Sequence, residues 1–190
     1  MIMDGKVIIF CAPSGSGKST VVHHLLENFD CFDFSISAAS RSPRGEEKDG
    51  VDYYFINNDE FNRRVAAGEF VEHEEVYPGC QYGTLKSEVE RIWSKGNVIL
   101  FDVDVKGGIN LKRYFADAAM SVFVQAPSVE VLRERLVKRG TDTPEAIEKR
   151  LAKASEEMTY APQFDVILVN DELDVCLANA VRIVSEFLSK

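Results

Sequence analysis

The sequence lacks several features that would point to common classes of protein. Its four cysteines, at positions 11, 31, 80 and 176, include no C-x-x-C pair. We therefore expect neither a zinc site nor a disulfide framework, and this cysteine usage is typical of a reducing cytoplasm. No apolar run approaches the length of a membrane span. The opening residues, Met1 to Lys6, lead directly into an apolar run and leave no room for a signal peptide. These absences predict a cytoplasmic protein without a membrane partner.

An excess of positive charge is also missing. The chain has 22 Lys and Arg against 31 Asp and Glu, a net charge of −9, and we therefore expect no nucleic-acid partner. The three histidines predict no metal site, because His23 and His24 are adjacent in a predicted helix and face different directions. The cations gather in two places. One is Arg41–Arg44, and the other is Arg133–Arg150, with six Lys or Arg against four Asp or Glu.

What the sequence does contain is a regular alternation of strand and helix patterns. At 190 residues and 45% hydrophobic composition, the chain can bury the core of one domain. Apolar runs predict strands at Val7–Cys11, Phe32–Ile36, Val98–Phe101, Ser121–Gln125 and Val166–Val169. Helical patterns occupy Thr20–Asn28, Leu85–Ser94, Gly108–Tyr114, Val129–Lys138, Pro144–Thr159 and Leu173–Leu188. The alternation predicts an α/β fold, a five-stranded parallel sheet with helices on both faces, whose ligands bind at the carboxyl ends of the strands.

Two segments interrupt this alternation. Residues 37–84 carry strand patterns at Asp52–Ile56 and Phe70–Val76 and a helix at Asp59–Ala67, which predicts a small mixed α/β insertion that folds over a substrate. Thr143 and Pro144 form an N-cap and first-turn pair, so we expect a helical hairpin with a glycine hinge, able to close as a lid. The predicted division is a core (1–36, 85–132 and 160–190), an insertion (37–84) and a lid (133–159).

A phosphate-binding loop joins the first predicted strand to the first helix. It comprises Ala12, Pro13, Ser14, Gly15, Ser16, Gly17, Lys18, Ser19 and Thr20. Gly15 and Gly17 let the backbone curl so that several N–H groups face one anion, and the following helix adds its partial positive charge. Lys18 would reach the β- and γ-phosphates, and the Ser19 hydroxyl would bind Mg²⁺. The chain is therefore predicted to bind a nucleoside triphosphate.

Ala12 departs from the usual G-x-x-x-x-G-K-[ST] pattern, because it stands where the first glycine is expected. Alanine fits that position if its φ is negative. The alternative is a Gly/Ser turn that precedes Lys-Ser by coincidence. The strand before the loop and the helix after it favour the phosphate-binding interpretation.

The run from Ser37 to Phe55 resembles the nucleoside-monophosphate-binding signature of guanylate kinases, in which an arginine pair precedes a Gly-x-Asp-Tyr-x-Phe motif. The resemblance continues along nearly the whole chain and in the family's order, through Gly68–Glu72, Tyr82–Thr84, Asp102–Asp104, Arg139–Thr143 and Asp165–Asp171. It implies a P-loop kinase core, a GMP-binding insertion and a lid, and the transfer of the ATP γ-phosphoryl group to GMP as a step in guanine nucleotide supply.

The chemistry of these residues supports the same substrates. Two arginines three residues apart suit a phosphate monoester with close to two negative charges. Guanine carries N1–H and N2–H₂ donors that one carboxylate can accept together, and the resemblance implies that Glu72 is this acceptor. The full acceptor set that it implies is Ser37, Arg41, Arg44, Tyr53, Glu72, Tyr82, Thr84 and Asp104, and it adds Asn170 to the ATP-binding residues.

Two departures from the family signature affect the same region. Ala39-Ser40 replaces the usual Thr-Thr before Arg41, and the run Gly45-Glu46-Glu47 shifts the Gly-Glu step by one residue. Either Glu46 or Glu47 can therefore correspond to the glutamate of the family.

The predicted mechanism needs no general base, because the attacking oxygen of the GMP phosphate is already ionised at pH 7. Catalysis then depends on alignment and charge neutralisation, with Mg²⁺ held by Ser19 and, through water, by Asp102. The residues assigned to neutralisation are Lys18, Arg41, Arg44, Arg135, Arg139 and Arg150. We expect a monomer or a weak homo-oligomer.

Two rival hypotheses remain. A guanylate-kinase-like protein-interaction module would keep the fold without catalysis, but such modules typically have a degraded phosphate loop, whereas Gly17-Lys18-Ser19 is intact. A kinase for another small acceptor, such as a uracil nucleotide or shikimate, would have no need of Glu72 beside the two arginines.

Overall fold

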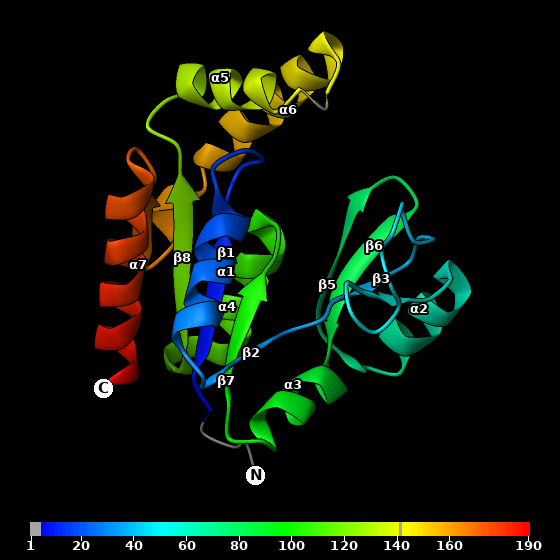
Figure 1. Ribbon diagram of the computed structural model, residues 1–190. Helices are drawn as coiled ribbons and strands as arrows, with labels where there is room; N and C mark the ends of the chain where they lie inside the picture. The colour runs from blue at the N-terminus through cyan, green and yellow to red at the C-terminus, as the bar shows by residue number, and fades with distance from the viewer. Residues whose placement is uncertain (1–4, 141) are drawn as a thin grey trace.

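The computed structural model describes residues 5–140 and 142–190, so Met1–Asp4, on which the absence of a leader was predicted, and Thr141 lie outside the described residues. Its main feature is a parallel five-stranded sheet of order β2-β7-β1-β8-β9 (Figure 1). The strands are β1 (Val7–Cys11), β2 (Phe32–Phe34), β7 (Val98–Asp102), β8 (Ala119–Gln125) and β9 (Val166–Val169). The predicted α/β fold and its parallel sheet are therefore confirmed.

Helices cover both faces of this sheet because its central strand is apolar on both faces. All five residues of β1 are buried, as a parallel strand sandwiched between helices requires. One face packs against α1 (Lys18–Asn28) and α7 (Leu173–Leu188). The other packs against α3 (Lys86–Trp93) and α4 (Val105–Phe115). Every strand of the sheet then ends at the same edge, where the phosphate-binding loop follows β1.

Several predicted elements of this layer have different bounds in the structure, and two of the differences have a clear physical reason. Strand β2 ends at Phe34 rather than Ile36, because the chain leaves the sheet after Ser35. Helix α4 begins at Val105 rather than Gly108. Asp104 caps it by accepting bonds from the first-turn N–H groups, and a Cβ at Gly108 would collide with the Cys11 sulfur. Close packing against β1 thus outweighs the low helix propensity of glycine.

A second, four-stranded sheet of order β4-β3-β6-β5 stands beside the first (Figure 1). Its strands are β3 (Ala38–Ala39), β4 (Tyr54–Phe55), β5 (Phe70–Tyr77) and β6 (Cys80–Leu85), and α2 (Asn58–Ala66) packs on it. The helix and β5 match the predicted elements of this segment, whereas the predicted strand Asp52–Ile56 shortens to β4. Strands β3 and β6 were missed.

Strand β6 has no apolar run and contains Gly83, both of which lower its β-propensity. The segment forms a strand because it pairs antiparallel with β5. Glycine is needed at position 83, because a Cβ there would lie 2.7 Å from the Glu72 carbonyl oxygen and 2.9 Å from the His73 Cβ.

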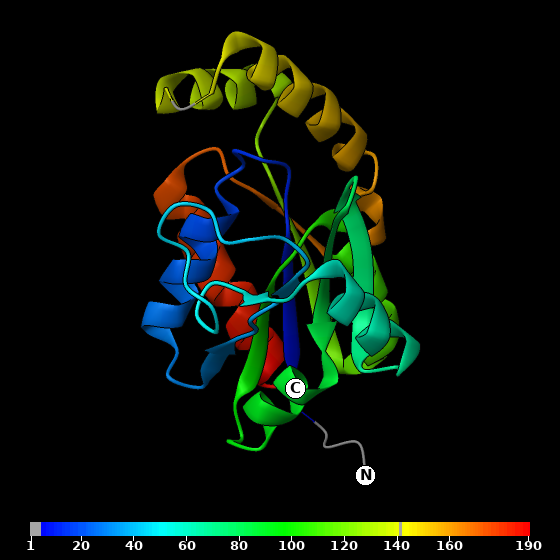
Figure 2. The ribbon, with the colours of Figure 1, turned by 90° about the vertical axis from the view of Figure 1, so that its right-hand side faces the viewer.

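Helices α5 (Val129–Arg139) and α6 (Pro144–Met158) arch over the carboxyl ends of the first sheet (Figure 2). As predicted, Thr143 caps α6 and Pro144 occupies its first turn. Gly140 ends α5 with a φ of 67°, a backbone conformation that glycine adopts without strain. In the described part of the chain, no helix has both the length and the apolar character needed to span a membrane.

Candidate active site

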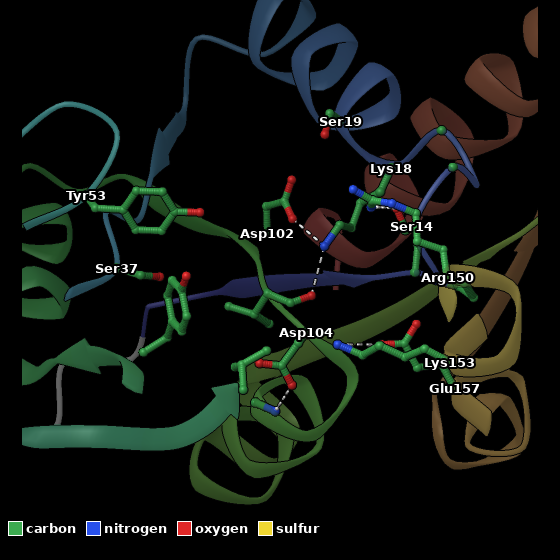
Figure 3. A pocket seen from close by; sticks show the side chains of 18 of the residues that line it. Ser14, Lys18, Ser19, Ser37, Tyr53, Asp102, Asp104, Arg150, Lys153 and Glu157 are labelled. Atoms are coloured by element: carbon green, nitrogen blue, oxygen red, sulfur yellow. Dashed lines mark hydrogen bonds and ion pairs between the residues drawn. The ribbon is translucent and has the colours of Figure 1, made fainter. Parts of the chain in front are cut away.

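A cleft of about 810 Å³ opens between the carboxyl edge of the first sheet, the second sheet and the α5–α6 arch. In Figure 3 Ser37 and Tyr53 lie on one side of it, and Ser14, Lys18 and Arg150 on the other. The structure places most of the predicted site residues on its walls: Ala12, Pro13, Ser14, Gly15, Gly17, Lys18, Ser19, Thr20, Ser37, Arg41, Arg44, Tyr53, Glu72, Tyr82, Asp102, Asp104, Arg135, Arg139 and Arg150.

The phosphate-binding loop has the backbone geometry that its sequence predicts. Gly15 and Gly17 both have a φ of 91°, a conformation that L side chains rarely adopt. Among the described residues Ala116 is the one non-glycine residue with positive φ, so Ala12 fits its position without strain. Helix α1 starts directly after Gly17 without a side-chain cap. Its first N–H groups therefore have no side-chain partner, and the residues that carry them line the cleft, as in an anion site.

Lys18 extends from the start of α1 to the end of β7. Its ammonium group forms an ion pair with the Asp102 carboxylate at 2.5 Å and donates to the Val103 carbonyl at 2.9 Å. Burial disfavours its charge, but the neighbouring acidic groups, Asp102 first among them, together outweigh this effect and raise the pKa of Lys18 above its ordinary value. The residue is therefore a fixed positive charge beside the loop.

On the opposite wall Arg41 lies among aromatic rings. Its guanidinium carbon lies 5.1 Å from the centroid of the Tyr53 ring and 5.8 Å from that of Tyr82, and its Nε donates to the Tyr82 hydroxyl at 2.8 Å. The two tyrosine rings meet edge to face. A guanidinium and two phenol groups thus converge on one point of the cleft, as the signature predicts.

Glu47 holds Arg41 in this position. It accepts both guanidinium NH groups, at 2.6 and 2.9 Å, and the Arg44 backbone N–H at 2.8 Å. These bonds lower the pKa of Glu47 to about 2. Of the two glutamates that the sequence left open, Glu47 is therefore the one that pairs with the arginines.

Glu72 is the carboxylate at the base of the cleft. The Thr84 hydroxyl donates to its Oε1 at 2.9 Å. Burial raises the pKa of Glu72 to about 7; the Thr84 bond opposes this shift, and the Asp104 and Glu74 carboxylates add to it. Gly107 leaves room for the second oxygen, because a Cβ there would lie 3.2 Å from Glu72 Oε2. A pair of donors facing Glu72 would favour its charged form.

Three arginines of the arch differ in their contacts. Arg135 donates to the Asn170 carbonyl at 2.8 Å, and Arg150 donates to the Ser14 hydroxyl at 2.7 Å and pairs with Asp142 at 3.2 Å. Arg139 lines the cleft and is exposed. Arg150 thus joins the arch directly to the phosphate-binding loop.

Three predicted site residues do not line the cleft. Ser16 and Thr84 are buried behind it. Asn170, which is also buried, donates to the Ser16 carbonyl at 2.8 Å, and a Cβ on Gly17 would collide with the Asn170 amide. Asn170 therefore contacts the back of the phosphate-binding loop in this structure.

Sequence reasoning missed two charged residues of the cleft, Lys153 and Glu157 of α6. They form an ion pair at 3.7 Å, and Figure 3 shows them opposite Asp104. Burial raises the pKa of Glu157, while Lys153 and Lys18 work against the shift. Their spacing of three and seven residues from Arg150 puts all three on one helix face, a signal that could have identified them.

Comparison with known proteins agrees with this geometry. The family model described as guanylate kinase matches residues 4–189. The chain belongs to the guanylate kinase family. A guanylate kinase of Bacteroides thetaiotaomicron is 54% identical over 99% of this chain and 92% of its own length. One from Bacteroides fragilis is 52% identical over 97% of this chain and 91% of its own length.

Solved structures show the same P-loop kinase fold. A guanylate kinase from Anaplasma phagocytophilum superposes with a TM-score of 0.75 and 29% identity, over 96% of this chain and 85% of that one. A shikimate kinase from Bacteroides thetaiotaomicron, 13% identical, superposes with a TM-score of 0.51 over 97% of this chain and 99% of that one. At that identity, the likeness concerns the fold alone.

Proposed function

We propose that this guanylate kinase transfers the γ-phosphoryl group of ATP to GMP within the cleft, giving ADP and GDP. The observation that carries the proposal is that one cleft joins a phosphate-binding loop to the half-buried Glu72 carboxylate and to the Arg41–tyrosine cluster. The loop suits the donor. The carboxylate and the arginine suit the two ends of a guanine nucleotide.

In the proposed acceptor site, Arg41, Arg44, Tyr53 and Tyr82 bind the GMP phosphate. Arg41 is already fixed by Glu47 and the rings, so little side-chain entropy is lost on binding. Glu72 accepts N1–H and N2–H₂ of guanine. Ser37, Thr84 and Asp104 surround the same base. Adenine offers no matching pair of donors and would cover the Glu72 carboxylate without pairing it, which costs about 1–3 kcal/mol.

In the proposed donor site, the N–H groups of the loop and of the start of α1 hold the ATP phosphates. Ser19 and Asp102 supply a hydroxyl and a carboxylate oxygen near these groups, which is the kind of donor that Mg²⁺ prefers. The metal would neutralise phosphate charge there. Asn170 acts in this site by holding the loop through the Ser16 carbonyl.

The proposed mechanism follows from the positions of the charges. Lys18 lies between the loop and Asp102 and neutralises the transferring group, together with Arg135, Arg139 and Arg150 from the arch. The attacking GMP oxygen is already ionised, so no side chain needs to remove a proton. In the proposed division, residues 37–84 form the GMP-binding insertion and residues 133–159 the lid, and both close over the core during turnover.

Calorimetric titration tests the acceptor site without requiring turnover. We expect GMP to bind at one site per chain, and AMP to bind at least tenfold more weakly because it cannot satisfy Glu72. Equal affinities for GMP and AMP would contradict the assignment of Glu72 to the base.

The same titration should depend on pH in a direction set by Glu72. With its pKa raised to about 7, Glu72 is largely protonated at pH 6.5 and ionised at pH 8.5. Guanine requires the ionised form, so the affinity for GMP should fall about fourfold from pH 8.5 to pH 6.5, and binding at pH 6.5 should release about three quarters of a proton from this residue. The buffer dependence of the binding enthalpy measures that release. A release that is unchanged in Glu72→Gln would rule out this source.

A further inference from the structure

The chain passes between the two sheets twice. Residues 35–37 lead from β2 to β3, and α3 leads from β6 back to β7. In Figure 1 α3 lies below the gap between the sheets, near the segment that leaves β2. Both connections therefore lie where the second sheet joins the first. Side chains located there can fix how the second sheet is oriented toward the core.

Glu88 of α3 occupies this position and is 2% exposed. Its Oε1 accepts the backbone N–H of Ile36 at 2.8 Å, and its Oε2 accepts the Tyr54 hydroxyl at 3.0 Å. Ile36 belongs to the first connection, and Tyr54 belongs to β4 of the second sheet. One buried carboxylate thus binds both connections and the second sheet.

Arg91 completes the cluster and ties it to the first sheet. It donates to Glu88 at 2.7 and 2.9 Å, to the Asp33 carboxylate of β2 at 3.1 and 3.3 Å, and to the Phe34 carbonyl at 3.2 Å. Burial opposes the charge of Glu88, but these bonds, with Arg91 the largest contributor, hold the pKa of Glu88 below its ordinary value. The carboxylate is therefore ionised and fully bonded, and its geometry is well defined.

The two groups that Glu88 binds, on Ile36 and Tyr54, are each next in the chain to a residue of the cleft. Ile36 precedes Ser37, and Tyr54 follows Tyr53. Ser37 and Tyr53 line the cleft in the proposed acceptor site. Strand alternation directs the Tyr54 ring away from the face that carries Tyr53. The second sheet also contacts the core at α4, where Asn110 donates to Glu74 at 2.7 Å. The Tyr54–Glu88 bond is a second point of attachment, and two such points fix the orientation of the second sheet.

We propose that Glu88, through the Ile36 N–H and the Tyr54 hydroxyl, is a positioning residue that orients the acceptor-binding sheet toward the phosphate-binding loop. This inference rests on the proposed acceptor site. Glu88 touches neither substrate, and it acts by keeping Ser37 and Tyr53 in register with Asp104 and Lys18. Its loss should therefore affect the use of the acceptor and leave the donor site unchanged.

Tyr54→Phe tests this role, because it removes one hydroxyl and keeps the ring. We expect the KM for GMP to rise three- to tenfold, about the effect of one lost hydrogen bond of ordinary strength, with kcat and the KM for ATP within twofold of wild type. Glu88→Gln should raise the KM for GMP at least as much. It provides an independent test of the same role if Tyr54→Phe folds poorly. Tyr114→Phe is the matched control, since Tyr114 is exposed on α4 and should change nothing.

A distance measurement separates this proposal from the proposed function. Spin labels at Cys31, which is exposed near β2, and at Ala67→Cys, after α2, span the two sheets once Cys80 is replaced by Ser. In the protein without nucleotide, Tyr54→Phe should broaden their distance distribution, whatever the acceptor is. A distribution as narrow as that of wild type, an unchanged KM for GMP, or an equal rise in the KM for ATP would overturn the positioning role.

Discussion

Replacing Lys18 by Met should lower kcat by about 10²–10³-fold, the usual cost of removing one preorganised charge from the transferring group. Methionine keeps the length of the side chain and removes its ammonium group, which in this structure lies between Asp102 and the Val103 carbonyl. The dissociation constant of GMP should stay within twofold of wild type, because the acceptor residues lie on the opposite wall of the cleft. A coupled assay of ADP release, together with calorimetric titration of GMP, measures both quantities.

The matched control for this variant is Lys138→Met, which removes the same charge from an exposed residue of α5 outside the cleft. Its turnover should equal that of wild type. Thermal unfolding of both variants shows whether the fold is intact. Wild-type turnover in Lys18→Met, or a loss of GMP affinity as large as the loss of turnover, would refute the role assigned to Lys18.

Replacing Glu72 by Gln should lower kcat/KM for GMP by about 10²–10⁴-fold. Two hydrogen bonds to a charged acceptor contribute about 1.5–3 kcal/mol each, and the amide offers one acceptor and one donor group where guanine presents donors only. The Thr84 hydroxyl can still donate to the amide oxygen, so the fold should persist. The KM for ATP should not change, because the phosphate-binding loop is untouched.

Glu75→Gln is the control for this variant, since Glu75 lies on the same strand and is exposed. It should keep wild-type kcat/KM. A loss of kcat/KM for GMP of less than threefold in Glu72→Gln, or an equal loss in the control, would contradict the proposal that Glu72 binds the guanine base.

The sequence predicted the backbone of the phosphate-binding loop and its flanking elements well because their determinants are local. Strand β1, the two glycines, Lys18 and the start of α1 lie within one short stretch, and the positive φ of Gly15 and Gly17 follows from that pattern. The cap of α6 at Thr143 was predictable for the same reason.

The acceptor side could not be built from local patterns, because its contacts join distant segments. Arg41 meets Tyr82 across 41 positions of the chain. Strand β6, which carries Tyr82, was missed because pairing with β5 and not its own propensity makes it a strand. The resemblance to guanylate kinases named these residues, and only the fold brings them to one point.

Other features needed side-chain geometry. The choice between Glu46 and Glu47 depends on which carboxylate reaches Arg41. The position of Asn170 behind the loop depends on the packing of the segment after β9. The Glu88 cluster carried no recognisable motif, because its partners come from β2, β4 and the connection between the sheets.

The most direct test of the account compares acceptors in one coupled ADP-release assay, with ATP and Mg²⁺ fixed and GMP, AMP, UMP and CMP supplied in parallel. The site predicts rapid turnover with GMP and, with each of the other three, a kcat/KM lower by at least two orders of magnitude, because only guanine pairs two donors with the Glu72 carboxylate. No turnover with GMP, or faster turnover with AMP, would contradict the assignment of this cleft to guanine nucleotides.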